Sequence, residues 1–432
     1  MPVLKTATLG CRVNQYETEF VRQGLEQVGY RDAADGEPAD LCIVNTCTVT
    51  NEGDSKSRHT IRHLARENPQ ARIVVMGCYA TRAPDEVAAL PNVAEVITDK
   101  RELPDLLGRF GVVDIPTGIS RFDSRQRAYV KVQDGCMLSC TFCIIPSVRP
   151  GLRSREPEHI VDEIRKLAAH GHREIVLTGI HLGHYGVDRN RGLAKQDWVR
   201  LSHLVERLAG IDEAGHEESF RIRLSSIEAT EVTRELIAVM QRHPERVCPH
   251  LHVSMQSGSD GVLRRMQRRW GAQRFLDRCR LVQDSLDQPA LTTDVIVGFP
   301  GETEAEFDET LRMCDDVGFS KIHVFPFSPR KGTPAATMPN QISPEVKQRR
   351  VERLQALGDE LRDRYYRSLA GRKLRVLVEG RLTDRPDVAA GTACRYAQVE
   401  LAGGDAKLPE RSTLVDVVAG AVSNGRIVAR LC

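Results

Sequence analysis

Three closely spaced cysteines give the sharpest chemical signal in this sequence. They stand in the run Cys136-Met-Leu-Ser-Cys140-Thr-Phe-Cys143, just after an expected strand. Three thiolates on one short loop can bind three corners of a cubane iron–sulfur cluster, which leaves the fourth iron open for an exogenous ligand. Zinc sites usually take four protein ligands, and no fourth Cys or His lies nearby in the sequence. The run therefore predicts a [4Fe–4S] cluster with one open iron.

A second set of cysteines is dispersed along the first 80 residues. Cys11, Cys47 and Cys78 each follow an apolar run that is expected to be a strand. The carboxyl ends of neighbouring parallel strands face a common crevice, so these three residues are expected to converge. Any one of them alone could be a small core residue, because cysteine is often buried. Their shared position favours a second [4Fe–4S] cluster.

The two sets of cysteines need a frame of strands and helices to position them. In the first 100 residues, strand candidates at 5–10, 40–45, 72–77 and 95–98 alternate with helix candidates at 15–28, 51–67 and 84–90. This spacing predicts a parallel sheet with flanking helices. The polar stretch 114–127, which contains Pro116 and Gly118, is expected to be a linker.

A second alternating region follows the linker. Its strand candidates lie at 128–133, 174–178, 221–224, 250–255, 292–298 and 321–325, and these six strands with crossovers predict a partial (β/α) barrel. A long charged helix at 343–369 is followed by β runs at 374–379, 396–401 and 414–419, which predict a small β-barrel. We therefore expect an α/β fold with an N-terminal parallel-sheet cluster domain at 1–115, a central partial barrel at 122–365 and a C-terminal β-barrel at 366–432.

Composition narrows the class of protein. The 432 residues hold 61 Lys+Arg and 59 Asp+Glu, a formal net charge of +2, which argues against a wholly basic nucleic-acid binder. The balance still allows a local excess of basic residues, and residues 366–432 hold eleven Lys or Arg against seven Asp or Glu. The sequence has no run of about 18 apolar residues and no signal-peptide pattern. We expect a cytoplasmic protein with no membrane association and no disulfides among its 12 cysteines.

The C-x3-C-x2-C run resembles that of the radical S-adenosylmethionine (SAM) superfamily, including the aromatic Phe142 before its last cysteine. The resemblance implies that SAM chelates the open iron and is cleaved to methionine and a 5′-deoxyadenosyl radical. It also implies contacts to SAM at the ends of the barrel strands, although a plain turn or barrel core is an equal reading of the same segments. The expected contacts are Phe142, Thr178, Gly179, Ser225, Gln256 and Ile296.

Both sets of cysteines, in this order, resemble the methylthiotransferase family over essentially the whole chain. That resemblance implies two [4Fe–4S] clusters, SAM as cofactor, a C-terminal TRAM-like domain that binds RNA, an electron donor and a sulfur source, and a monomer. The segments 8–18 and 223–228 look like the branch that inserts a methylthio group at C2 of threonylcarbamoyladenosine at position 37 of tRNA. Alternatives are the same reaction on isopentenyladenosine or on a ribosomal-protein aspartate, and a non-catalytic iron–sulfur protein that binds RNA.

Further residues are candidates for substrate and RNA contacts. Arg12, Arg223 and Glu228 are expected to shape the substrate site, with Glu228 expected to position an arginine rather than to touch the anionic substrate. Arginines around Trp270 suit contacts to RNA phosphates, although a solvated helix face explains each of them equally well. These arginines are Arg264, Arg265, Arg268 and Arg269. His181 and His184 could ligate a metal, but loop histidines are more often polar surface groups.

Overall fold

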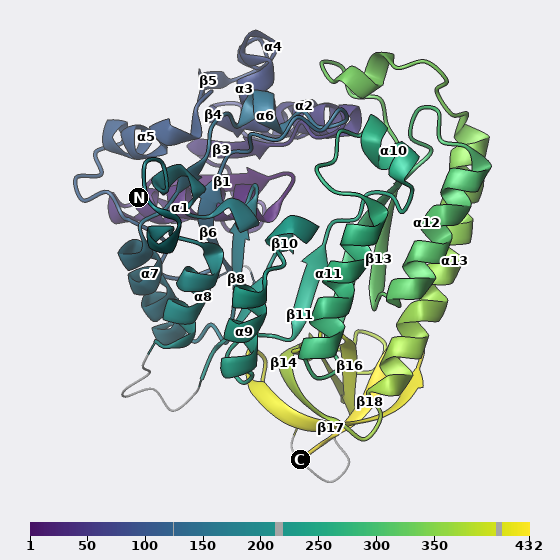
Figure 1. Ribbon diagram of the computed structural model, residues 1–432. Coiled ribbons are helices and arrows are strands. Elements are labelled where there is room, and N and C mark those ends of the chain that lie inside the picture. Colours follow the sequence, from purple (N-terminus) through teal and green to yellow (C-terminus); the bar gives the residue numbers. More distant parts are fainter. Residues whose placement is uncertain (124, 212–218, 403–407) are drawn as a thin grey trace.

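The computed structural model describes residues 1–123, 125–211, 219–402 and 408–432. It has an N-terminal parallel sheet, a central arc of strands flanked by helices, and a C-terminal closed β-barrel (Figure 1). The predicted α/β fold class is confirmed. The predicted linker 114–127 contains neither helix nor strand up to Gln126, and its residue 124 lies outside the described residues. No described helix is both long and apolar enough to cross a membrane.

The N-terminal sheet is parallel and is covered by helices on both faces. Its strand order is β2-β1-β3-β4-β5, and alternate residues of β4 face two different cores: Ile73 and Val75 face one, Val74 and Met76 the other. The strands are β1 Val3–Thr8, β2 Arg31–Asp32, β3 Leu41–Thr46, β4 Arg72–Gly77 and β5 Val93–Val96. The helices are α1 Arg12–Gln27, α2 Asn51–Glu67, α3 Cys78–Arg82, α4 Pro84–Ala88 and α5 Leu103–Arg109.

The central part is an arc of strands in two sheets, parallel except for the short β7, which pairs antiparallel with β6. The sheets have the orders β7-β6-β8-β9 and β10-β11-β12-β13, and a parallel bridge between Ile222 and Val247 connects them. The strands are β6 Arg127–Asp134, β7 Arg153–Ser154, β8 Glu174–Gly179, β9 Arg221–Leu224, β10 Ser226–Ile227, β11 His250–Val253, β12 Ala290–Val297 and β13 Lys321–Pro326. The helices are α6 Ile145–Val148, α7 Pro157–Ala169, α8 Leu201–Ala209, α9 Arg234–Arg242, α10 Asp260–Arg265, α11 Ala272–Ser285, α12 Glu304–Val317 and α13 Pro344–Ser368.

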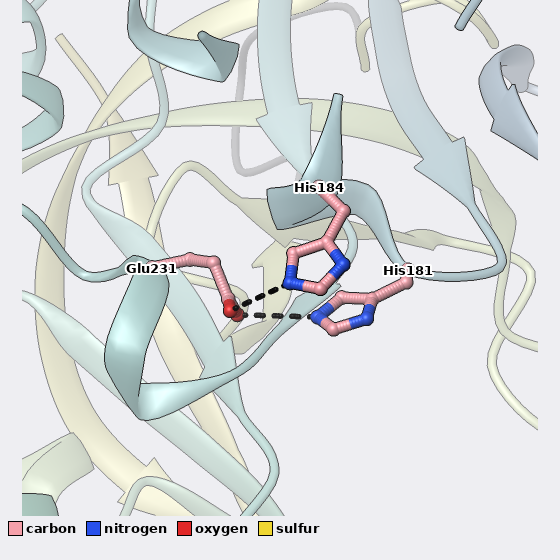
Figure 2. Close-up of side chains that lie close together, drawn as sticks. All are labelled: His181, His184 and Glu231. Atoms are coloured by element: carbon pink, nitrogen blue, oxygen red, sulfur yellow. Dashed lines mark ion pairs between the residues drawn. The ribbon is translucent and has the colours of Figure 1, made fainter. Parts of the chain in front are cut away.

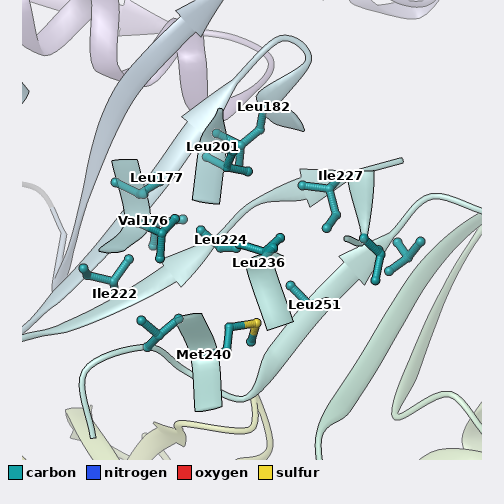
Figure 3. Packing of buried hydrophobic residues seen from close by; sticks show 14 of the residues in the cluster. Val176, Leu177, Leu182, Leu201, Ile222, Leu224, Ile227, Leu236, Met240 and Leu251 are labelled. Carbon is teal, nitrogen blue, oxygen red and sulfur yellow. The ribbon is translucent and has the colours of Figure 1, made fainter. Parts of the chain in front are cut away.

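The two faces of the arc differ in chemistry. Leu177, Ile222, Leu224 and Leu251 point outward, where they pack with Leu236 and other residues of the flanking helices in the largest hydrophobic core (Figure 3). Because side chains alternate along a strand, the residues between them face the inside of the arc. That inner face is mainly polar, and we call the side of the arc that it lines the lumen.

The C-terminal barrel closes the lumen at the amino ends of the strands. Its five strands are closed in the order β14-β15-β16-β18-β17, whereas the sequence predicted only three runs. The short, glycine-containing β15 and the terminal β18 gave no clear periodic signal. The strands are β14 Lys373–Arg381, β15 Val388–Ala393, β16 Gln398–Ala402, β17 Leu414–Ser423 and β18 Arg426–Leu431.

A buried charge network joins this barrel to the arc, and we call it the floor. Glu174 is fully buried; Nε of Arg221 lies 2.6 Å, and Nε of Arg223 2.7 Å, from its carboxylate. Arg221 also donates to the carbonyl of Thr392 (2.9 Å), and Arg223 to that of Ala393 (3.1 Å). Buried charges are costly unless they are paired, so each part depends on the other for these bonds.

Candidate functional site

The loop after β6 gathers Cys136, Cys140 and Cys143. The N–H of Cys143 donates to the carbonyl of Cys140 (3.1 Å), which turns the chain so that the three thiols lie within electrostatic reach of one another. Burial, together with the neighbouring thiols of Cys140 and Cys136, raises the pKa of the Cys143 thiol to about 12. Such thiols become thiolates only beside a positive centre, as a cluster iron would provide. The residues therefore fit a cluster held by three cysteines.

Two histidines and a glutamate lie beside this loop (Figure 2). Nδ1 of His181 lies 3.8 Å from Sγ of Cys136, and its Nε2 lies 3.4 Å from a carboxylate oxygen of Glu231. His184 stacks on His181 with ring centroids 3.6 Å apart and also faces Glu231, at 3.6 Å. His181 is only 6% exposed, so it is not a surface group as its loop position suggested. The buried imidazole of His181 therefore orients the side chain of Cys136.

Arg268 holds the other side of the same loop. Its guanidinium lies 3.4 Å from Sγ of Cys140 and forms an ion pair with Glu228, which also accepts from Nε1 of Trp270 (3.0 Å). The side chain of Arg268 is 4% exposed. Burial raises the pKa of the Cys140 thiol, whereas the charge of Arg268 lowers it. Arg268 therefore contacts Cys140 and favours its thiolate form.

The dispersed cysteines also meet, at the carboxyl edge of the N-terminal sheet. Cys11 precedes α1, Cys47 follows β3, and Cys78 is the first residue of α3. Burial raises the pKa of both Cys11 and Cys47, and the neighbouring Cys78 raises both further. A Cβ atom at Gly10, where φ is +96°, would lie 2.9 Å from Cβ of Cys47, so only glycine allows this approach. The set fits a second cluster held by three cysteines.

Arg149 connects the two sets of cysteines. Its Nε lies 3.3 Å from Sγ of Cys78, while its carbonyl accepts from the N–H of Cys136 (3.3 Å). Its other guanidinium nitrogens donate to Glu17 at 2.7 and 2.8 Å and to Asp134 at 2.9 and 3.0 Å. Only 1% of the side chain is exposed. One buried residue thus fixes the position of one set relative to the other.

The residues expected to contact SAM gather at one edge of the arc. Thr178 and Gly179 end β8, and the N–H of Ser225, just past β9, donates to the carbonyl of Leu177 (3.0 Å). Gln256, with φ +66°, is bonded through its backbone to Asp294 and Ile296 of β12, at 2.9 Å each. Ile296 and Phe142 of the cysteine loop pack on the same apolar cluster. All six therefore lie at the carboxyl ends of the strands of the arc, on the side of the cysteine loop. We call this end of the lumen its mouth.

The residues expected to contact substrate separate into different places. Arg12 lies at the first turn of α1, with its guanidinium carbon 5.9 Å from the centre of the Tyr129 ring on the inner face of the arc. Arg223 is buried in the floor, and Glu228 is occupied by Arg268 and Trp270. Because Arg223 is committed to internal partners, the structure does not support a substrate contact from it. Glu228 pairs with an arginine, Arg268, in keeping with the positioning role expected of it. Arg12 remains a candidate for a substrate contact.

The arginine patch expected to bind RNA also divides. Arg265 is paired with Glu306 (2.8 Å), and Arg268 is buried beside Cys140. Only Arg264 and Arg269 are exposed. The patch is therefore not one continuous cationic surface: sequence spacing could not show that two of its four arginines have carboxylate partners on other elements.

Comparisons with known proteins cover most of the chain. Residues 4–99 match the family described as "Uncharacterized protein family UPF0004", and residues 130–314 match the radical SAM superfamily. The chain is 41% identical to the threonylcarbamoyladenosine tRNA methylthiotransferase MtaB of Bacillus subtilis, over 92% of this chain and 89% of the relative. The Thermotoga maritima protein of the same name is 37% identical, over 88% and 87%.

A solved structure shows a similar fold at low identity. The radical S-adenosylmethionine methyltransferase TsrM from Kitasatospora setae matches with a TM-score of 0.57 at 13% identity, over 78% of this chain and 77% of that one. At this identity the match concerns the fold alone.

Proposed function

Because the chain belongs to the radical SAM methylthiotransferase family, we propose that it replaces the C2 hydrogen of threonylcarbamoyladenosine at position 37 of tRNA with a methylthio group. The observation that carries the proposal is the pair of three-cysteine sites linked by Arg149. The C2 hydrogen is not acidic enough for removal by a side-chain base. The reaction therefore requires radical chemistry, and the family implies a [4Fe–4S] cluster and SAM for it.

The proposed role of the loop cysteines is to hold that cluster at the mouth of the lumen. When bound there, the cluster supplies the electron that cleaves SAM. His181 and Arg268 orient two of its ligands, Cys136 and Cys140, from opposite sides. Thr178, Gly179, Ser225, Gln256, Phe142 and Ile296 are proposed to position SAM there.

The proposal includes a second [4Fe–4S] cluster at Cys11, Cys47 and Cys78. Anaerobically purified protein is then expected to hold about eight iron atoms per chain. Replacing Cys136, Cys140 and Cys143 with Ala should leave about half of them, and so should replacing Cys11, Cys47 and Cys78. If the N-terminal triple variant keeps all of its iron, the second cluster does not exist.

The substrate implies further partners. The relatives named above are tRNA methylthiotransferases. We propose that this protein acts as a monomer and contacts the tRNA backbone through Arg264, Arg269 and its C-terminal barrel. The reaction consumes electrons and sulfur, so an electron donor and a sulfur source must also reach the protein.

The proposal is tested by comparing two tRNA substrates. Reduced, cluster-loaded protein is incubated with SAM, sulfide and tRNA that carries either threonylcarbamoyladenosine or isopentenyladenosine, and the digested nucleosides are analysed by mass spectrometry. We expect a methylthio group in place of one hydrogen only on threonylcarbamoyladenosine. Product on the isopentenyl tRNA alone would overturn the substrate, and SAM cleavage without product on either tRNA would point to a protein substrate.

A further inference from the structure

The lumen contains a polar cluster that the expected SAM contacts do not include. His252 lies on β11, Asp294 on β12 and His323 on β13. Strand register places Thr292 beside His252 and Asp294 beside His323, so all of these side chains share the inner face. Ile296 is two residues further along β12 on this face and packs on the same cluster as Phe142. The polar cluster therefore lies directly below the proposed SAM site.

The imidazole of His252 lies between two polar partners. Nδ1 of His252 lies 3.0 Å from the hydroxyl of Thr292, and its Nε2 lies 3.2 Å from Oδ2 of Asp294. The ring of His323 is 5.9 Å from that of His252. The side chain of His252 is 12% exposed and that of Asp294 30%. His252 is thus preorganised, with its imidazole facing the carboxylate of Asp294.

Arg12 brings a positive charge that has no ion-pair partner to the same place. Within the described parts of the chain, no carboxylate lies within ion-pair distance of Arg12, in contrast to Arg127, Arg149, Arg221 and Arg223. Its charge nonetheless reaches the cluster: burial and Lys321 lower the pKa of His323, and Arg12 lowers it further, although Asp294 raises it. Burial raises the pKa of Asp294, but His252, His323 and Arg12 outweigh that effect, so Arg12 faces this carboxylate at longer range. A partly buried cation without an ion-pair partner indicates a site for an anionic ligand.

We propose that Arg12, with His252 and His323, binds the carboxylate of the N6 substituent of the substrate adenosine. This inference rests on the proposed function, because threonylcarbamoyladenosine carries an anionic group at N6. Arg12 follows Cys11 directly, so a base whose N6 group is held there lies between the two cysteine sites. Arg12 also disfavours a divalent metal ion at His252, Asp294 and His323 by charge repulsion.

The same geometry explains discrimination between the two adenosines. An isopentenyl group offers no acceptor, so its binding would leave Arg12 desolvated without a partner. A site built for a polar group rejects an apolar analogue far more strongly than an apolar pocket rejects a slightly different alkyl group.

The test pairs a change in the protein with a change in the ligand. Anticodon stem-loop RNAs are made with threonylcarbamoyladenosine and with its carboxamide, and binding to the cluster-loaded protein is measured by fluorescence anisotropy without reductant or SAM. The wild type should bind the carboxamide about 10- to 100-fold more weakly than the acid. Arg12→Gln should bind both RNAs equally and about as weakly as the wild type binds the carboxamide, whereas Arg12→Lys should restore part of the preference.

Controls separate the outcomes. Iron content is measured for every variant because Arg12 neighbours Cys11, and Arg349→Gln on the exposed side of α13 should behave as the wild type. If Arg12→Gln still prefers the acid over the carboxamide, or if the wild type does not discriminate, the inference is wrong. If the wild type fails to modify threonylcarbamoyladenosine at all, the proposed function is wrong, and that result comes from the separate tRNA assay.

Discussion

At the scale of single residues, Arg149 has the most connections in the candidate site. Its guanidinium contacts Cys78, Glu17, Asp134 and Asn14, and its backbone contacts Cys136. Burial raises the pKa of Glu17, but the charges of Arg149 and Lys131 outweigh it and hold that pKa at about 2. The carboxylates therefore stay ionised and need the arginine.

Replacing Arg149 with Met should destabilise the protein strongly. The change leaves two buried carboxylates with less compensation and removes the hydrogen bond to Cys78, so the free energy of unfolding should fall by about 3–5 kcal/mol. Denaturant unfolding of the protein measures this. Arg353→Gln, a half-exposed arginine on α13, is the control and should cost less than about 1 kcal/mol. A loss for Arg149→Met as small as that of the control would contradict the role assigned to Arg149.

The residue scale is also where sequence reasoning reached its limit. Spacing and strand position were enough to single out the six cysteines, because thiolate ligands need only a loop or adjacent strand ends. Arg149 and Glu17 gave no signal, and His181 was expected to be a surface group, since charged and polar residues are normally on the surface and their burial depends on partners from distant segments. The motif that contains Arg223 is visible in the sequence, whereas its pairing with Glu174, 49 residues earlier in the chain, is not.

At the scale of elements, the arc of strands separates structural and functional side chains by alternation. Outward residues form the apolar core, and inward residues form the floor, the polar cluster and the mouth. Phe325 on β13 is paired in register with Ile296 and lies two residues beyond His323 on the same face. Although apolar, it is 49% exposed.

Phe325 is therefore expected to stack on the substrate base at the mouth of the lumen. Replacing it with Ala should weaken binding of the stem-loop RNA about 5- to 150-fold, because stacking of one base on an aromatic ring contributes about 1–3 kcal/mol. Anisotropy titration measures the affinity, and Val113→Ala, an exposed apolar residue away from the arc, is the control. Equal affinity of Phe325→Ala and the wild type would exclude stacking.

The elements themselves were largely predictable. The strands of the N-terminal sheet and of the arc appear as apolar runs because they are buried on at least one face. The sequence does not predict β15, because its small residues Val-Ala-Ala-Gly-Thr-Ala show no hydrophobic alternation although most of them are buried. It does not predict β18 because only alternate residues of that short strand are buried. Closure itself depends on long-range pairing that no local pattern reveals.

At the scale of the whole molecule, the C-terminal barrel is both a floor for the lumen and a candidate RNA surface. Deleting it would expose Arg221, Arg223 and Glu174, so truncation cannot separate RNA binding from stability. Point variants on the outer wall of the barrel can separate the two effects. Lys373 of β14 and Arg430 of β18 both pair in register with Val418 of β17, and both are exposed.

Lys373 and Arg430 are expected to contact RNA phosphates. Changing each to Gln should weaken tRNA binding and reduce the slope of log affinity against log salt by about one per side chain, because fewer counterions are released. Binding is measured over a series of salt concentrations. Arg353→Gln, whose charge is already paired with Glu304 and Asp308, should leave the slope unchanged. An unchanged slope in the double variant would place the RNA elsewhere.

The most direct test of the account is the nucleoside content of tRNA from a strain that lacks this protein. Mass spectrometry should show that 2-methylthio-threonylcarbamoyladenosine is lost, that threonylcarbamoyladenosine accumulates, and that the wild-type protein restores the product whereas a Cys136→Ala variant does not. Methylthiolated threonylcarbamoyladenosine at normal levels in the deletion strain, with no other protein able to make it, would contradict the central claim.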